Sequence, residues 1–298
     1  MLDAPPPRTR RGPSRSTLVA AVSAVVASAV PADPAVAQDP SPRFGVWKLR
    51  SDAPPPAVNI MTYEPYGDGG MRITVWSTNG DGETNEWGYV TMFDEEFRPV
   101  SGQENAETAV EFVDERTTRI RNRRNGRVSQ EIINVLSDDG NTIENEYIRI
   151  AEDGTRRSSH AVYERVLRDP SQLVGRYELE SVEGWTEDGG WVAAPGWSDP
   201  SGYLVYDADG TMRVQLTATP PPPDNAEIIG GNAAYYGTWE VHRTEATVSH
   251  HRVGHLDPAQ RGTTVKRSFE FDGERLRLSP APERTVRLTW RRVMPPPE

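Results

Sequence analysis

Apolar and polar residues alternate along many short stretches of this chain. In one of them Val286, Leu288 and Trp290 alternate with Arg287 and Thr289. The same period of two recurs over residues 71–76, 177–180, 211–216, 268–271 and 275–278. This period predicts β-strands with one face in a core and the other in solvent, which is typical of antiparallel sheets.

Tight-turn dipeptides separate these stretches. Asn-Gly or Asp-Gly stands at 79–80, 125–126, 139–140, 153–154, 209–210 and 272–273. Both dipeptides favour the positive φ angles of short hairpin turns. No long amphipathic helix is predicted after residue 37. An all-β up-and-down meander is therefore expected, closed into a barrel so that no strand edge stays exposed. A β-sandwich is the alternative fold.

The pattern occurs twice. Residues 45–49 and 175–179 share the pattern G-x-[W/Y]-x-L, residues 163–166 and 290–293 share aromatic-x-R-V, and residues 68–72 and 209–213 share D-G-x-M-R. Three matches in the same order indicate a duplication. We therefore expect two tandem domains, at residues 43–166 and 172–294, joined by a short polar linker.

The first 37 residues have the order of a secretory signal peptide. Four arginines precede an uncharged Ala/Val-rich stretch at 17–30, and an A-x-A cleavage pattern ends at Ala37. The stretch is shorter than the roughly 20 residues that span a bilayer. A bacterial periplasmic or secreted protein, cleaved after Ala37, is expected. Arg10-Arg11 leaves general secretion and twin-arginine export both open.

Composition narrows the function classes. The chain has no cysteine, which excludes disulfides, thiolate nucleophiles and zinc-thiolate sites. Its formal net charge of -11 disfavours nucleic acid as a partner. No nucleophile-elbow or phosphate-binding glycine motif is present, and no later segment is expected to span a membrane. A binding protein is therefore favoured over an enzyme.

The second copy resembles the bacterial lipocalin-like domain family. The resemblance is carried by residues 173–179, 199–206, 209–212, 235–241, 248–251 and 267–271. It implies a calycin-type up-and-down barrel with one open end, and the first copy looks like a more distant member. Binding of a small apolar molecule follows only by analogy from this fold.

The resemblance also implies a structural pair in each barrel. In lipocalin barrels an aromatic residue near the first strand packs on an arginine near the last strand and plugs the closed end. Trp47 with Arg165 and Tyr177 with Arg292 would be the matching pairs. Such stacking is worth about 0.5–2 kcal/mol.

Candidate ligand contacts lie mostly in the second copy. Three tryptophans between its first two strands would either form a lid over an apolar ligand or pack down to seal the core. The full set of candidates is Trp185, Trp191, Trp197, Tyr203, Tyr235, Trp239, His251 and Arg267.

The histidines of the second copy suggest metal or haem binding as an alternative. If residues 247–255 form a strand, His251 and His255 share one face and His250 lies on the other. Two histidines on one face would bind a metal or a haem iron, but the sequence assures no third ligand. No cofactor is therefore expected.

Three functions stay open at this stage. The first is an exported protein that binds a small apolar ligand in a barrel cavity. The second is a barrel enzyme, either a cofactor-free isomerase or cyclase or a haem-dependent enzyme, in which His251, His255 or Arg267 would act inside the barrel. The third is a structural or interaction protein with filled barrels. A cavity above about 300 Å³ would favour the first. The oligomeric state is not predicted.

Overall fold

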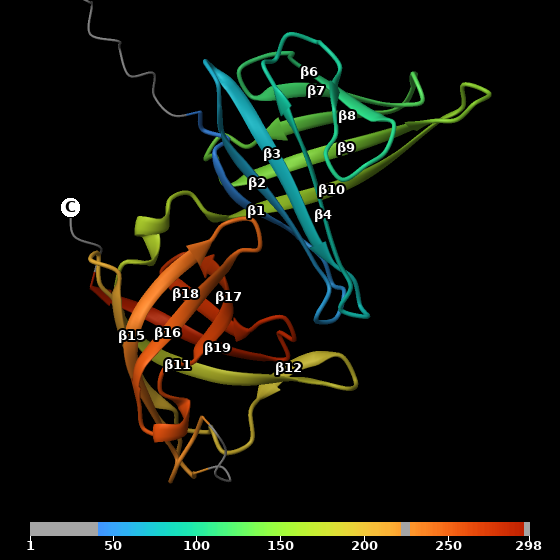
Figure 1. Ribbon diagram of the computed structural model, residues 1–298. Coiled ribbons are helices and arrows are strands. Elements are labelled where there is room, and N and C mark those ends of the chain that lie inside the picture. Colours follow the sequence, from blue (N-terminus) through green and yellow to red (C-terminus); the bar gives the residue numbers. More distant parts are fainter. Residues whose placement is uncertain (1–40, 222–226, 295–298) are drawn as a thin grey trace, which may run out of the picture. The chain divides into compact units, whose positions relative to one another are not determined.

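The computed structural model describes residues 41–221 and 227–294, in which nearly all regular secondary structure is β-strand (Figure 1). Two short 3₁₀ helices complete the described elements, η1 (Pro170–Leu173) between the two sheets and η2 (Pro258–Gln260) after β16. Neither these nor any other helix of the described ranges has the length and apolar character needed to cross a membrane. The signal peptide predicted for residues 1–37 lies outside the described residues.

The first sheet has ten antiparallel strands in the order β4-β3-β2-β1-β10-β9-β8-β7-β6-β5. Its edge strands approach one another where the backbones of Gly88 and Ser101 exchange hydrogen bonds of 3.1 and 2.8 Å. The barrel is therefore nearly closed. Its strands are β1 (Gly45–Leu49), β2 (Val58–Tyr66), β3 (Gly70–Thr78), β4 (Thr84–Thr91), β5 (Arg98–Pro99), β6 (Ala106–Phe112), β7 (Thr117–Arg124), β8 (Arg127–Leu136), β9 (Thr142–Ile150) and β10 (Arg156–Leu167).

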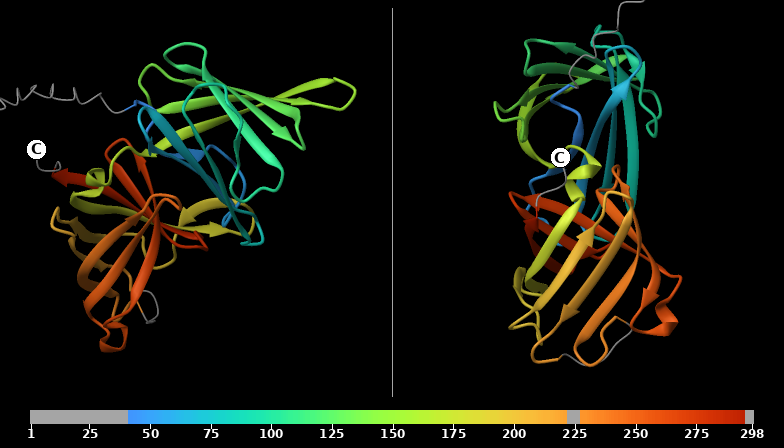
Figure 2. Two further views of the ribbon diagram at one scale, coloured as in Figure 1. Left: turned by 45° about the horizontal axis from the view of Figure 1, so that its top comes forward. Right: turned by 90° about the vertical axis from the view of Figure 1, so that its left-hand side faces the viewer.

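The second sheet closes completely. Strand β11 pairs with β13 on one side and with β19 on the other, so eight strands form a barrel and β12 adds a hairpin to β11. The right-hand view of Figure 2 shows its yellow and orange strands side by side as one curved sheet. The strands are β11 (Gly175–Thr186), β12 (Gly190–Ala193), β13 (Ser201–Tyr206), β14 (Thr211–Thr217), β15 (Asn232–His242), β16 (Thr247–His255), β17 (Thr264–Asp272), β18 (Arg275–Pro280) and β19 (Val286–Met294).

These closures confirm two antiparallel barrels and exclude the sandwich. The predicted alternation holds as well: Met212 and Val214 are buried, while Thr211, Arg213 and Gln215 on the same strand are exposed. The duplicated motifs occupy matching places in the two barrels. The G-x-[W/Y]-x-L motif begins the first strand of each barrel, β1 or β11, and the aromatic-x-R-V motif lies in the last, β10 or β19. The D-G-x-M-R motif lies at the turn between the second and third barrel strands, where β2 joins β3 and β13 joins β14.

Each barrel has its own aromatic core. In the second, Tyr177, Phe269 and Trp290 are at most 1% exposed, and in the first Trp47 is fully buried beside the ring of Tyr63. Burying one large apolar side chain contributes about 1.5–3 kcal/mol, so these residues stabilise barrels that have no disulfide.

Candidate functional site

A buried histidine lies at the centre of the second barrel. His250, on β16, is 2% exposed and accepts or donates hydrogen bonds at both ring nitrogens. Its Nε2 lies 2.6 Å from the hydroxyl of Tyr206, and its Nδ1 lies 2.8 Å from the hydroxyl of Tyr235. Three strands thus meet through one imidazole, because β13 supplies Tyr206 and β15 supplies Tyr235.

Burial holds this cluster neutral. It lowers the pKa of His250 well below its usual value, and the positive charges of Arg267 and Arg252 lower it further. Burial also raises the pKa values of Tyr206 and Tyr235. A neutral imidazole has one donor and one acceptor nitrogen, so one tyrosine donates to it and the other accepts from it. With both nitrogens occupied, His250 does not present a free base to a substrate.

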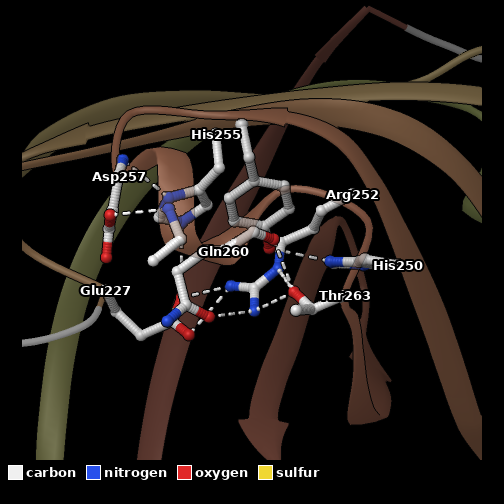
Figure 3. A network of polar contacts seen from close by, with 9 residues as sticks. Glu227, His250, Arg252, His255, Asp257, Gln260 and Thr263 are labelled. Carbon is white, nitrogen blue, oxygen red and sulfur yellow. Dashed lines mark hydrogen bonds and ion pairs between the residues drawn. The ribbon is translucent and has the colours of Figure 1, made fainter.

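A second network fixes the far end of β16 (Figure 3). Arg252, whose side chain is 3% exposed, donates to both carboxylate oxygens of Glu227 at 2.8 and 2.9 Å. It also donates to Gln260 at 2.8 Å and to the Thr263 hydroxyl at 2.6 and 2.9 Å. A buried guanidinium satisfied in this way ties the residue 227 segment and η2 to the barrel wall.

The faces predicted for the histidines are wrong. His250 and His255 are buried, whereas the His251 side chain is 43% exposed and bonds Thr264 at 2.9 Å. A bulge causes the change, because Gly237 pairs with Arg252 while the preceding Tyr236 pairs with Gly254, which leaves one residue of β16 unpaired. A regular period of two therefore does not hold across this strand.

His255 has a structural environment. Its ring stacks on Tyr235 at a centroid distance of 5.7 Å, and its Nδ1 accepts the backbone N–H of Asp257 at 2.9 Å. In the part of the chain that the structure describes, no three His, Cys, Asp or Glu side chains are grouped as metal ligands would be. The structure does not bring His251 and His255 together as a metal or haem pair.

The three tryptophans do not form one lid. Trp185 and Trp191 are directly paired across the β11–β12 hairpin, with their rings edge to face at 5.4 Å. The guanidinium of Arg287 lies 4.4 Å from the Trp191 ring centroid. Trp197 is separate and only 8% exposed, as part of the core.

The other candidates divide between the two faces of the barrel wall. Trp239 faces inward, with its ring 5.0 Å from that of Tyr206. Arg267 pairs in register with the fully buried Val248, and its charge acts on His250. Tyr203, by contrast, pairs with the exposed Glu178 on the outer face, so a ligand inside the barrel would not contact it.

Both aromatic-arginine pairs come together. The guanidinium of Arg165 lies 4.0 Å from the Trp47 ring centroid, and that of Arg292 lies 5.0 Å from the Tyr177 ring centroid. Each arginine also donates to backbone carbonyls near the start of its barrel: Arg165 to Phe44 at 2.5 Å and Arg292 to Val174 at 3.1 Å. Partial burial lowers the pKa of Arg165 to about 10.

The first barrel has a polar centre of its own. Arg43 is 2% exposed and donates to the side chain of Asn134. Asn134 donates to Asn145 at 2.7 Å, and Asn145 donates to the Tyr147 hydroxyl at 3.0 Å. Burial raises the pKa of nearby Tyr63 to about 12. These residues form a buried hydrogen-bonded network beside the apolar core of the barrel.

Beyond this polar centre the first barrel holds a hollow of about 670 Å³. Its wall is partly apolar, at Trp87, Val100, Ala106 and Ile150, and partly polar. It lies beside the β9–β10 hairpin, which extends past the neighbouring strands in Figure 1. No motif in the sequence marks this site, because the residues around it come from six strands and become neighbours only through strand register.

A second hollow, of about 610 Å³, lies against the wall of the second barrel. The outward side chains that line it include Tyr203, Arg213, Tyr236 and Val253. Tyr236 is 59% exposed and Val253 is 63% exposed. This hollow is thus on the outside of the barrel wall and is not an interior cavity.

The second half of the chain therefore has the architecture of a closed up-and-down β-barrel. An aromatic-arginine pair, contributed by its first and last strands, packs at one end of the barrel. Residues 174–293 match the family model described as a lipocalin-like domain, and this part of the chain belongs to that family. The first barrel, at residues 45–167, has no such match of its own, and its order of strands suggests a tandem copy. No curated protein matches the chain.

Proposed function

We propose that this protein binds a small organic molecule with an apolar body inside a barrel hollow. The observation that carries the proposal is the 670 Å³ hollow of the first barrel. Sites for small molecules in proteins measure about 300–1,000 Å³ and combine an apolar wall with a few polar groups. A structural protein with filled barrels would not need such a space.

The apolar wall supplies the affinity. Trp87 is half-buried and stacks on Tyr89 at a centroid distance of 6.4 Å, so its ring is held in place before a ligand arrives. A ligand that covers this ring and the adjoining Val100 removes apolar surface from water, at roughly 25 cal/mol per Å². The export proposed from residues 1–37 would expose the hollow to molecules outside the cytoplasm.

The second barrel gives less support to the enzyme alternative. His250 has both ring nitrogens bonded, and Arg252 binds Glu227, Gln260 and Thr263. The buried His255 is bonded at Nδ1, whereas its Nε2 makes no hydrogen bond within the described residues and lies 3.8 Å from a carboxylate oxygen of Glu227. We therefore assign the Tyr206, His250 and Tyr235 cluster to stability and the binding function to the first barrel.

A neutral fluorescent probe tests this proposal. N-phenyl-1-naphthylamine should bind saturably with one equivalent in the first barrel, with increased emission. Trp87→Ala should weaken this binding about tenfold, because an aromatic contact is worth about 0.5–1.5 kcal/mol beyond its area. Tyr66→Ala, at an exposed position outside the hollow, is the matched control. The absence of saturable binding, or equal affinity in Trp87→Ala, would contradict the proposal.

A further inference from the structure

We propose that the molecule held in the first barrel is an organic anion and that Arg149 and Arg157 bind its acidic group. This inference rests on the proposed function, since it names the chemical class of the ligand for the same hollow. It also accounts for a feature of the barrel that folding alone does not explain.

Five polar residues form a row across five neighbouring strands. Successive pairs in register are Thr108 with Asn122, Asn122 with Gln130, Gln130 with Arg149, and Arg149 with Arg157. Residues directly opposite one another in antiparallel strands have their side chains on the same face. All five line the hollow.

This face is the interior one. Gln130 and Arg149 each lie four residues from a buried asparagine on the same strand, Asn134 and Asn145 respectively. Side chains at even spacing along a strand share a face. The two arginines therefore point to the barrel side of the sheet and stand near its open end, where they remain exposed to solvent.

Arg149 and Arg157 form an unfavourable pair as the protein stands. Their side chains begin about 5 Å apart, and like charges directly opposite each other destabilise a sheet. Within residues 41–221 and 227–294 neither guanidinium has an ion pair or side-chain hydrogen bond, although most arginines on neighbouring strands do. A bound anion would remove the repulsion.

The rest of the row presents donors toward the same place. The Thr108 hydroxyl donates to Asn122 Oδ1 at 2.8 Å, and Asn122 Nδ2 donates to Gln130 Oε1 at 2.9 Å. With its Oε1 bonded to Asn122, Gln130 keeps its amide nitrogen as a donor, and Gln130 pairs in register with Arg149. At this end of the row Arg149 and Arg157 present only donors, which are exposed to solvent, and a ligand with acceptor oxygens would replace water as their partner.

The carboxylates that line the hollow are already engaged. Glu107 receives two hydrogen bonds from Arg123, at 2.6 and 2.8 Å, and Asp153 accepts the backbone N–H of Thr155 at 2.9 Å. These bonds lower the pKa values of both acids. With Arg124 included, the lining carries four arginines against two acids, in a chain whose net charge is -11.

The chemistry defines the ligand class. A planar guanidinium can donate to two oxygens of a carboxylate or a sulfonate at once, so the acidic group would lie between Arg149 and Arg157. The apolar body would then extend toward Trp87 and Val100 on the opposite wall. A mostly apolar monoacid of moderate size fits this arrangement.

Two probes that differ only by the anion test the inference on the full chain. One is N-phenyl-1-naphthylamine, and the other is 8-anilino-1-naphthalenesulfonate, which adds a sulfonate to the same ring system. The wild type should bind the sulfonate at least about tenfold more tightly, because hydrogen bonds to charged groups exceed those between neutral groups.

Paired variants locate the preference. Arg149→Gln/Arg157→Gln should abolish it while the affinity for the neutral probe stays the same. The control Arg119→Gln/Arg156→Gln removes the same charge from β7 and β10, at side chains that pair with Glu111 and Glu131 outside the hollow, and should keep the preference. Without ligand, Arg149→Gln/Arg157→Gln should melt at the same or a higher temperature than the wild type.

The outcomes separate the two proposals. Equal affinity for both probes in the wild type, or a preference that survives Arg149→Gln/Arg157→Gln, would overturn the anion assignment and leave the proposed function intact. Loss of binding of both probes in the wild type would overturn the proposed function. A lower melting temperature in Arg149→Gln/Arg157→Gln would show that the two arginines stabilise the fold, which also contradicts the inference.

Discussion

The residues around His250 keep its imidazole ring neutral. An isolated histidine titrates near pH 6.5, but this one is enclosed by two tyrosines and lies near two arginines. The free energy needed to bury an imidazolium beside positive charge exceeds the stabilisation from its hydrogen bonds, so the ring stays neutral. The same side chain on the next residue, His251, is half-exposed, with its Nδ1 bonded to Thr264 and its Nε2 lying 3.7 Å from a carboxylate oxygen of Glu240.

This neutrality predicts a pH dependence of stability. The folded pKa of His250 is depressed, so between that value and about 6.5 the unfolded chain binds more protons than the folded one. The free energy of unfolding should therefore fall as the pH drops below about 6.5, by about 1.4 kcal/mol per pH unit from this residue. Urea unfolding followed through amide NMR signals of β16 should show about 2 kcal/mol more loss between pH 7.5 and 5.0 in the wild type than in His250→Gln.

An independent readout guards against a variant that folds poorly. Nitrogen-15 chemical shifts of the His250 ring in the wild type should report a neutral imidazole at pH 5. An imidazolium at that pH, or the same pH dependence of stability in His250→Gln, would be incompatible with the burial argument.

At the scale of elements, one bulge decides what the second barrel contains. The extra residue in β16 lets His250, Arg252 and His255 all face the buried side, although regular spacing would separate His250 from His255. Gly254 within a strand pattern is a signal for a bulge, but such a glycine does not say on which side of it the register changes.

The bulge needs a glycine on the partner strand. A Cβ at Gly237 would stand 1.9 Å from the carbonyl oxygen of His251, which is backbone and cannot turn away. Gly237→Ala should therefore lower the free energy of unfolding by about 1–3 kcal/mol, the usual cost of overpacking. Thermal and urea unfolding would measure it.

Gly184 provides the control within the same sheet. A Cβ there would meet nothing within 4 Å, so Gly184→Ala should be neutral or slightly stabilising. Equal effects of the two substitutions would show that the close approach at Gly237 does not determine stability.

At the scale of the whole molecule, the two barrels close in different ways. The second closes through an extended ladder in which β11 and β19 pair over eight positions, whereas the first closes through the Gly88–Ser101 bridge. Few hydrogen bonds hold the first seam, so local opening there requires less free energy.

Amide hydrogen exchange would show this difference. Backbone amides of Gly88 and Ser101 should exchange at least about tenfold faster than amides in the centre of the β11–β19 ladder, after correction for intrinsic rates. A ligand in the first barrel should slow exchange around the hollow. Equal protection of the two seams would indicate that the first barrel closes by contacts other than the bridge.

Tandem copies have diverged in their interiors. The second barrel buries a hydrogen-bonded tyrosine-histidine cluster, while the first combines a polar centre with a hollow lined by arginines. The aromatic-arginine pairs at their closed ends have stayed alike. The aromatic-arginine pairs are alike because both barrels have to be closed at one end. The interiors differ, and the interior is where a ligand would bind.

Local sequence determined the strands, the hairpin turns, the duplication and the barrel class, because alternation and turn residues act over neighbouring positions. It also pointed to the end pairs through the family resemblance. Tertiary structure alone decided that His250 and not His251 faces inward, and that Arg149 stands opposite Arg157. Both arrangements depend on the register of the strands. A bulge or a turn can shift the register by one residue without a change in amino-acid composition, and each such shift exchanges the two faces of a strand.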